Sequence, residues 1–376
     1  MAARATLLAT LTTKEAEASF LRAAMVQLGV SVKLVDISLH AGASTLDGDE
    51  KKRRMAEVAA HIGHDLAGKR AEEIGVVVGI GGGTGGEIVL QVFDALPALH
   101  PKILITPLPF DPRPALADKV FIIVPTLVDI LGLNDLLRQT LEAAAAVVAG
   151  VCNQPVPAPQ LAEPMIGLTA LGATGVAVAS IEAGLRDRGE ACAVFHANGF
   201  GGAGFARFAE EGAFKAVVDL TCHELNRLLF AGDHVSMKNR FTAAADLPQI
   251  VLPGGLNFLG LGPVDTLEPA HSARPHYQHS KQFTHVKVLP EEMAEACEIL
   301  AGHLNDANSP VHVIVPMGGF SHRDCPSGEI EDEALRILCF EMLVARARHY
   351  EVESIPHHIN EPPTAQRVLE LLKPYL

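Results

Sequence analysis

The sequence predicts an α/β fold with two layered domains, each built on a mainly parallel sheet, and a cleft between the domains. The first observation is the length of 376 residues, which exceeds the size at which a single hydrophobic core usually stops growing. The second is the alternation of short β-rich runs with longer helical patterns, which is typical of βαβ units. The third is composition, because 48% hydrophobic residues with 5% aromatics and no Trp suit helices that lie close on buried sheets.

The N-terminal domain is expected to span residues 1–150. Its β-branched runs predict strands, and the helical apolar periodicity between them predicts helices. The expected strands are Ala5–Thr10, Val32–Ile37, Ile74–Ile80, Lys102–Thr106 and Val120–Val124. The expected helices lie near Lys14–Leu28, Glu50–Ala67, Glu87–Leu96 and Val128–Ala149.

A proline-rich stretch, residues 151–164, is expected to be a linker, because its prolines and its lack of apolar periodicity stop the preceding Ala-rich helix. The C-terminal domain then spans residues 165–376, where a second alternation predicts another α/β layer. Its expected strands are Met165–Ala170, Ala191–His196, Ala216–Leu220, Gln249–Leu252, His285–Val288, Val311–Val315 and Val352–Ile355.

Charge and cysteine content exclude several classes of protein. The chain has 30 basic and 44 acidic residues, a net charge of −14, which disfavours nucleic acid as a partner. No apolar run reaches the length of a membrane span, and the N-terminus lacks the pattern of a signal peptide. The six cysteines show no disulfide or metal-ligand spacing, so reduced thiols in the cytoplasm are expected.

A glycine-rich segment follows the third expected strand and precedes a helix. Glycines let the backbone approach a ligand closely, and the first N–H groups of the helix favour an anion. The sequence therefore predicts a Rossmann-like phosphate-binding loop, the alternative being a tight turn without a ligand. The predicted binding residues of this loop are Gly82, Gly83, Thr84, Gly85 and Gly86.

A second glycine-rich segment follows the strand that ends at His196. Its predicted binding residues are Asn198, Gly199, Gly201 and Gly202. With one such loop in each domain, we expect the two to face each other across an interdomain cleft, where ligands prefer to bind. His196 is a candidate acid or base or a phosphate contact, the alternative being a structural histidine.

Lys14 lies at the start of the first expected helix, just after the first strand. At the carboxyl edge of a parallel sheet a lysine reaches bound phosphate, so Lys14 is a candidate ligand contact. The alternative is an exposed lysine in a helix capped by the preceding threonines.

Asp219 lies where another expected strand of the second domain ends, and Glu224 lies on the turn that follows. They are candidates for a catalytic base or for binding magnesium, and the alternative is that Glu224 only stabilises a helix N-terminus. Most of the 17 histidines follow the linker, yet no HExxH or cysteine-pair motif accompanies them, so no structural metal site is predicted. These histidines are also candidates to surround a substrate anion.

Six motifs occur along the chain in a fixed order. They are GGTGGE (Gly82–Glu87), VDILGLN (Val128–Asn134), FHANGFGG (Phe195–Gly202), DLTCHEL (Asp219–Leu225), LPQIVLPGGLNFLGLG (Leu247–Gly262) and HHINEP (His357–Pro362). Together they resemble the Tm-one-like ATP-binding family, whose founding member is the N-terminal half of a plant tobamovirus-resistance protein. The resemblance spans nearly the whole chain and implies two α/β domains, ATP as ligand, and assembly into dimers or larger homo-oligomers.

Three functions remain open at this stage. The first is a nucleotide-binding protein or nucleotide-dependent enzyme that holds ATP, with magnesium, in the interdomain cleft. The second is an enzyme that acts on a small carboxylate or phosphorylated metabolite without ATP, through His196, Asp219 and Glu224. The third is a regulatory or assembly module that binds a ligand without turnover.

Overall fold

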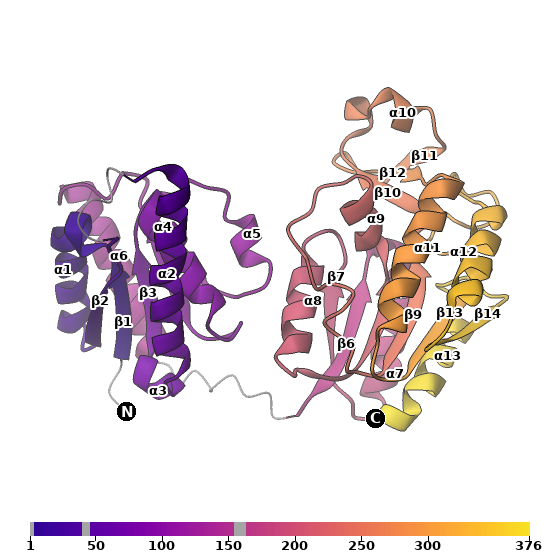
Figure 1. Ribbon diagram of the computed structural model, residues 1–376, viewed down its shortest axis with the longest axis horizontal. Helices are drawn as coiled ribbons and strands as arrows, with labels where there is room; N and C mark the ends of the chain where they lie inside the picture. The colour runs from indigo at the N-terminus through magenta and orange to yellow at the C-terminus, as the bar shows by residue number, and fades with distance from the viewer. Residues whose placement is uncertain (1–3, 40–45, 154–162) are drawn as a thin grey trace. The chain divides into compact units, whose positions relative to one another are not determined.

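Parallel strands flanked by helices form each of two units, residues 1–160 (unit 1) and 161–376 (unit 2), in the computed structural model (Figure 1). The structure describes residues 4–39, 46–153 and 163–376. Both main sheets are parallel and both units are layered, so the predicted α/β class with Rossmann-like layers is confirmed. No helix in these three ranges has the length and apolar character needed to cross a membrane.

The sheet of unit 1 is parallel throughout and has the spatial order β2-β1-β3-β4-β5. Of its inner strands, β3 and β4 are buried at every residue and β1 at every residue but Arg4, as expected for apolar runs covered on both faces. The strands are β1 (Arg4–Ala9), β2 (Ser31–Asp36), β3 (Val76–Ile80), β4 (Lys102–Thr106) and β5 (Ile122–Pro125).

Helices cover both faces of this sheet (Figure 1). Leu21 and Leu141 belong to the core between the sheet and helices α1 and α6, and Met55 and Phe93 belong to the core beneath α2 and α4. The helices are α1 (Leu11–Gln27), α2 (Gly48–Ala67), α3 (Ala71–Ile74), α4 (Gly83–Asp94), α5 (Arg113–Leu116) and α6 (Asp135–Asn153).

Several expected boundaries in unit 1 are wrong, and three of them concern helices α4 and α6. Helix α4 begins at Gly83 rather than Glu87, so the glycines predicted to form a loop are its first turn. Helix α6 begins at Asp135 rather than Val128, because the preceding segment contains left-handed residues, among them Gly132 with φ 74°. It continues to Asn153, into the expected linker, because a single glycine is tolerated within a helix. The rest of the expected linker, 154–162, lies outside the described residues.

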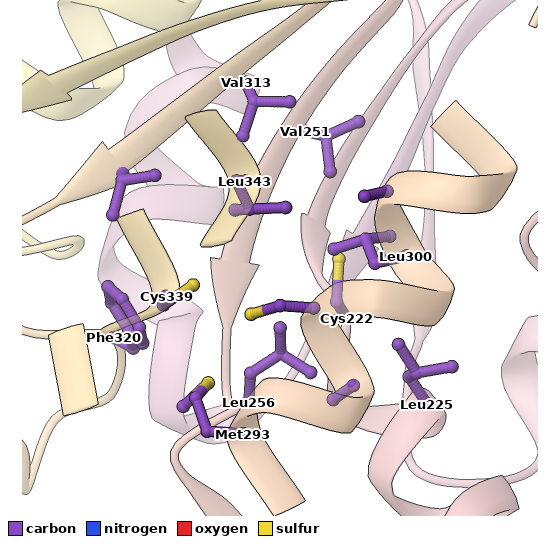
Figure 2. Packing of buried hydrophobic residues seen from close by; sticks show 14 of the residues in the cluster. Cys222, Leu225, Val251, Leu256, Met293, Leu300, Val313, Phe320, Cys339 and Leu343 are labelled. Atoms are coloured by element: carbon purple, nitrogen blue, oxygen red, sulfur yellow. The ribbon is translucent and has the colours of Figure 1, made fainter. Parts of the chain in front are cut away.

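The main sheet of unit 2 is also parallel, with the spatial order β14-β13-β9-β8-β6-β7. Helices α7 and α13 share a core on one face, whereas α11 and α12 pack on the other. Figure 2 shows the second of these cores, where Cys222, Leu300 and Leu343 converge. The strands are β6 (Met165–Ala170), β7 (Cys192–His196), β8 (Phe214–Thr221), β9 (Gln249–Gly254), β13 (Val311–Pro316) and β14 (Glu351–Ile355).

The helices of unit 2 follow these strands in the βα alternation that the sequence predicts. They are α7 (Gly175–Arg186), α8 (Gly201–Glu210), α9 (His223–Leu229), α10 (Pro269–Ser272), α11 (Pro290–Asn305), α12 (Glu333–Arg346) and α13 (Pro362–Leu372).

A small antiparallel sheet was not predicted. It has the order β10-β12-β11, and Figure 1 shows it with α10 at one end of the main sheet of unit 2. Its strands are β10 (Phe258–Leu261), β11 (His276–Gln278) and β12 (Thr284–Lys287). The segment His285–Val288 was expected in the main layer, which is wrong, because His285 pairs with Gly260 and Tyr277.

Candidate functional site

The sheet of unit 1 changes its direction of growth between β1 and β3. The chain adds β2 on one side of β1 and then places β3, β4 and β5 on the other. In open parallel sheets of this order, ligands bind at the carboxyl ends of the two strands that flank the reversal. The glycine-rich turn after β3 and the threonines after β1 lie at this point.

At the start of helix α4, backbone N–H groups have no hydrogen-bond partner among the described residues. The first bond of its helical pattern runs from the Gly86 N–H to the Gly82 carbonyl, at 2.7 Å. The N–H groups of Gly83, Thr84 and Gly85 come before this first bond and therefore have no acceptor within the helix. No side chain of the described residues caps this helix. The positive end of the helix dipole and three N–H groups favour an anion here.

The glycines of this segment fall into two groups. A Cβ added to Gly79 would lie 2.2 Å from Val89 Cγ1, and one added to Gly81 would lie 2.8 Å from the Gly85 carbonyl carbon, so packing requires both glycines. Among the described residues, a Cβ on Gly82 would come no closer than 3.9 Å to any heavy atom, and one on Gly83 meets none within 4 Å. Side-chain packing therefore explains the first pair of glycines but not the second.

Threonine hydroxyls at the start of α1, directly after β1, lie beside the glycine turn. Thr10 Oγ1 and Thr13 Oγ1 are 3.1 Å apart, and a Cβ on Gly85 would lie 3.7 Å from Thr10 Oγ1. The start of α1 is fixed from β2, because Asp36 Oδ1 accepts the Leu11 N–H at 3.1 Å. These hydroxyls add polar groups at the carboxyl end of β1.

Lys14 contacts the protein itself. Its ammonium donates to the Ile130 carbonyl, and Glu17, one turn further along α1, accepts the Gly132 N–H at 2.7 Å. Both contacts hold the loop after β5, which contains the VDILGLN motif. The structure thus places Lys14 near the sheet edge but gives its charge a partner in this loop.

Two leucines in neighbouring loops have left-handed backbones. Leu108, two residues after β4, has φ 53°, and Leu127, two residues after β5, has φ 58°. Thr106 Oγ1 accepts the Leu108 N–H at 3.3 Å, and Thr126 donates to the Val128 carbonyl at 2.6 Å, which helps hold these conformations. Such strained backbones occur mainly at ligand clamps and active sites.

The second glycine segment is filled by a side chain of the protein. Glu224 Oε1 accepts the N–H groups of Gly199 and Gly202, each at 3.0 Å. A Cβ on Gly202 would lie 2.1 Å from Glu224 Oε2, and Gly199 has φ 94°. The carboxylate of Glu224 therefore occupies the anion position at the start of α8, and packing explains the glycines around it.

Arg240 joins the two predicted carboxylates of unit 2. Its Nε donates to Glu224 Oε2 at 2.6 Å, and its Nη1 and Nη2 donate to the two oxygens of Asp219, each at 2.8 Å. The side chains of Arg240 and Glu224 are fully buried, and that of Asp219 is 9% exposed. Thr169 also donates to Asp219 Oδ1, at 2.7 Å.

The electrostatics of this triad keep the guanidinium of Arg240 charged. Burial alone would lower the pKa of Arg240, but the charges of Asp219 and Glu224 outweigh it and raise that pKa above its usual value. The adjacent cavity, about 10 Å³, is lined by Asp219, Arg240 and eight other residues and has room for about one water. These contacts fit a structural role for Asp219 and Glu224.

The structure separates the remaining predicted residues from this triad. His196 and Asn198 are exposed, at the end of β7 and in the turn that follows. A Cβ on Gly201 would lie 2.4 Å from the His196 carbonyl oxygen. Among the described residues, no group of three or more His, Cys, Asp or Glu side chains could hold a metal ion.

Sequence reasoning missed three contributors, Thr10, Asp36 and Arg240. The first two end parallel strands or follow them directly, and that position is a usable signal in a sequence. Arg240 lies in a segment whose apolar residues show neither a helical nor a strand periodicity. Its contact with Glu224 depends on tertiary packing, which the sequence does not reveal.

Comparison with known proteins gives matches over most of the chain. Residues 40–157 match the N-terminal domain of an uncharacterised protein family, UPF0261, and residues 163–376 match its C-terminal domain. A UPF0261 protein of Rhizobium meliloti is 31% identical over 89% of this chain and 86% of its own length. Another, of Mesorhizobium japonicum, is 30% identical over 96% of both chains. The ToMV resistance protein Tm-1(GCR237) of Solanum lycopersicum is 27% identical over 78% of this chain and 40% of its own length.

Proposed function

This chain belongs to the UPF0261 family, and we propose that it binds the phosphate groups of a nucleotide at the start of helix α4 in unit 1. The ligand lies at the carboxyl ends of β1 and β3. The N–H groups of Gly83, Thr84 and Gly85 donate to it, and Thr10 and Thr13 add hydroxyl contacts.

One observation carries this proposal, at the point where the sheet reverses: among the described residues, a Cβ on Gly83 would meet no heavy atom within 4 Å, and one on Gly82 only Pro107 Cγ, at 3.9 Å. Glycine destabilises a helix by roughly 1 kcal/mol relative to alanine, so a glycine in a helix that packing does not require calls for another reason. Close approach of a ligand to the backbone is such a reason. At the start of α8, by contrast, Glu224 already supplies the anion.

The chemistry favours a phosphate over a neutral ligand. Hydrogen bonds from N–H groups to a charged acceptor contribute about 1.5–3 kcal/mol each, and the helix dipole adds to them. The resemblance to the Tm-one-like family makes ATP the first nucleotide to test. We propose that magnesium arrives bound to the phosphate oxygens of ATP, as it does in many nucleotide sites.

Isothermal titration with Mg-ATP tests the proposal through a matched pair of variants. Gly83 and Gly48 are the first residues of α4 and α2, and a Cβ on either meets no heavy atom within 4 Å. They differ in that Asp47 already accepts the N–H groups of Asp49 and Glu50 at the start of α2.

We expect Gly83→Leu to weaken Mg-ATP binding at least about tenfold, a change of about 1.4 kcal/mol, whereas Gly48→Leu binds like the parent protein. The proposal fails if the parent protein gives no binding heat with Mg-ATP, Mg-ADP or pyrophosphate. It also fails if Gly83→Leu binds as tightly as Gly48→Leu.

A further inference from the structure

We propose that Tyr277, His285 and His322 form a proton-transferring catalytic site in unit 2, for a small carbonyl compound with an adjacent C–H bond. This activity goes beyond phosphate binding by unit 1 and does not depend on it. The three residues come from β11, β12 and the loop after β13.

The site lies where the main sheet of unit 2 changes direction. The chain adds β7 on one side of β6 and places β8, β9, β13 and β14 on the other. The loop after β6 reaches the site directly, because the His322 N–H donates to the Ala173 carbonyl at 3.1 Å. Tyr277 belongs to the same buried cluster as Ala173. This is the position at which parallel α/β sheets bind ligands.

A column of stacked rings fixes the orientation of His285. It runs from His223 through Phe258 and His285 to His279, with ring centroids 4.5, 4.0 and 4.8 Å apart. The inner end is held by Arg227, whose Nε donates to His223 Nε2 at 3.1 Å. Since His223 is buried and His279 is exposed, the column leads from the core to the surface.

The hydroxyl of Tyr277 lies between two imidazoles. Its oxygen is 2.6 Å from His285 Nδ1 and 3.4 Å from His322 Nε2. A hydroxyl has one proton, so Tyr277 donates to one ring and accepts from the other. Each neutral ring also carries one proton. The hydrogen-bonded chain His322–Tyr277–His285 therefore has two arrangements, which differ by a shift of every proton from one end toward the other.

Both imidazoles are neutral near pH 7. Burial lowers the pKa of His285 to about 2, and burial also lowers the pKa of His322. Burial raises the pKa of Tyr277, so its hydroxyl keeps its proton. The other groups that act on these imidazoles are His223, His279, Arg227, Arg323, Glu329 and His358.

His322 Nδ1 is the last nitrogen at the His322 end of this hydrogen-bonded chain. It is a buried atom, and no hydrogen-bond partner for it exists among the described residues. When Nε2 of the same ring carries the proton, Nδ1 is a base without a partner. An unpaired polar atom inside a protein is destabilising unless a ligand or water completes it, which is a mark of functional sites.

The proposed step is balanced within the substrate and the three side chains. His322 Nδ1 removes the proton next to the carbonyl, and its Nε2 proton passes to the Tyr277 oxygen. The Tyr277 proton passes to His285 Nδ1, and His285 Nε2 gives its proton to the carbonyl oxygen. The C–H electron pair becomes the C=C bond while the carbonyl π pair forms the O–H bond, so a ketone becomes its enol.

Hydrogen–deuterium exchange tests this step. The parent protein is incubated in D₂O with pyruvate, acetoacetate or dihydroxyacetone, and ¹H NMR follows the loss of the C–H signal next to the carbonyl. We expect exchange with at least one compound, and a reduction of about 100-fold in Tyr277→Phe and in His322→Gln. His276→Gln is the control, because His276 lies on the same strand with its Nδ1 on the Arg274 carbonyl, and it should keep the parent rate.

Exchange no faster than in buffer with all three compounds overturns the proposal, as does exchange that survives Tyr277→Phe. Nitrogen-15 NMR of the parent protein without substrate shows which imidazole nitrogens of the hydrogen-bonded chain carry a proton. His285 should show one protonated and one unprotonated nitrogen at pH 6, and His322 should do so at pH 8. The signal of His285 Nδ1 should move in Tyr277→Phe. A doubly protonated His285 at pH 6 contradicts the proposal.

Discussion

Glu224 and Arg240 form a fully buried ion pair, with 2.6 Å between Oε2 and Nε. The other oxygen of the same carboxylate accepts the N–H groups of Gly199 and Gly202 at the start of α8. This pair gives two of the family motifs, FHANGFGG and DLTCHEL, a shared structural role. At the start of α4, by contrast, no carboxylate of the described residues caps the helix, so this end is the better place for a phosphate.

Removing Arg240 should destabilise unit 2 strongly. In Arg240→Met two buried carboxylates lose their partner, and breaking a buried ion pair in this way destabilises by about 3–5 kcal/mol. The combined variant Asp219→Asn, Glu224→Gln, Arg240→Met should recover part of that loss, because no unpaired charge remains. Urea unfolding measures both, and equal stability of Arg240→Met and the parent protein would show that the triad is not structural.

Alanine at two helix starts should have opposite effects. Gly202→Ala places a Cβ 2.1 Å from Glu224 Oε2 and 2.5 Å from Arg240 Cδ, so we expect a clear decrease in the free energy of unfolding. Gly83→Ala meets nothing within 4 Å and should stabilise unit 1 by about 0.4–1 kcal/mol. Urea midpoints of the two variants compare them directly. A stabilised Gly202→Ala would contradict the packing described for α8.

Relief of backbone strain should stabilise the loop after β5. Leu127 is 91% exposed and has φ 58°, so it gains little from burial while its backbone is unfavourable. Asparagine tolerates this conformation far better, and we expect Leu127→Asn to stabilise the fold by about 1 kcal/mol. Leu136→Asn is the control, because Leu136 is also exposed, at 64%, but lies in helix α6. A loss of stability in Leu127→Asn similar to that of the control would contradict the strain argument.

Buried His100 should make unit 1 sensitive to acid. Burial, and after it the charge of Lys102, lowers the pKa of His100 to about 4, and its Nε2 lies 3.0 Å from the Gly75 carbonyl. In the unfolded chain His100 takes up its proton near pH 6.5, whereas in the folded protein it does so near pH 4. The contribution of neutral His100 to the free energy of unfolding is therefore fully present above pH 6.5 and is lost as the pH decreases toward 4. The slope for one proton is about 1.4 kcal/mol per pH unit.

Urea unfolding at pH 7.5, 6 and 5 measures this slope, and His100→Gln should show a shallower one. Other buried histidines contribute to both proteins, so the difference between the two slopes isolates His100. Identical slopes would mean that His100 is protonated to the same extent in the folded and unfolded states.

Strand positions were largely predictable because buried parallel strands are continuous apolar runs. Lys102–Thr106 and Met165–Ala170 were predicted to the residue. The antiparallel hairpin of Tyr277 and His285 was not, because its strands are three and four residues long and polar. Gly83–Gly86 were read as a loop because glycine is a weak helix former, yet the helix they begin is held by its buried residues, such as Ile88 and Phe93.

The site was predictable only where local sequence determines it. A glycine turn between a strand and a helix is visible in a sequence, and the residues Gly82–Gly86 do lie at the edge where the sheet reverses. The partners of Glu224 and Tyr277 are not visible, because Arg240 and His322 are brought to them by tertiary packing. Two glycine segments that look alike in sequence therefore differ in structure. One has N–H donors without a partner in the part of the chain that the structure describes, and the other is filled by a carboxylate.

The most direct test of phosphate binding at α4 is an amide NMR titration of the whole protein with Mg-ATP. We expect the N–H signals of Gly83, Thr84 and Gly85 to shift with the ligand, because they donate to it. The signals of Gly199 and Gly202 should stay in place, because Glu224 accepts their hydrogen bonds. Shifts at Gly199 and Gly202 with none at Gly83–Gly85 would contradict the account.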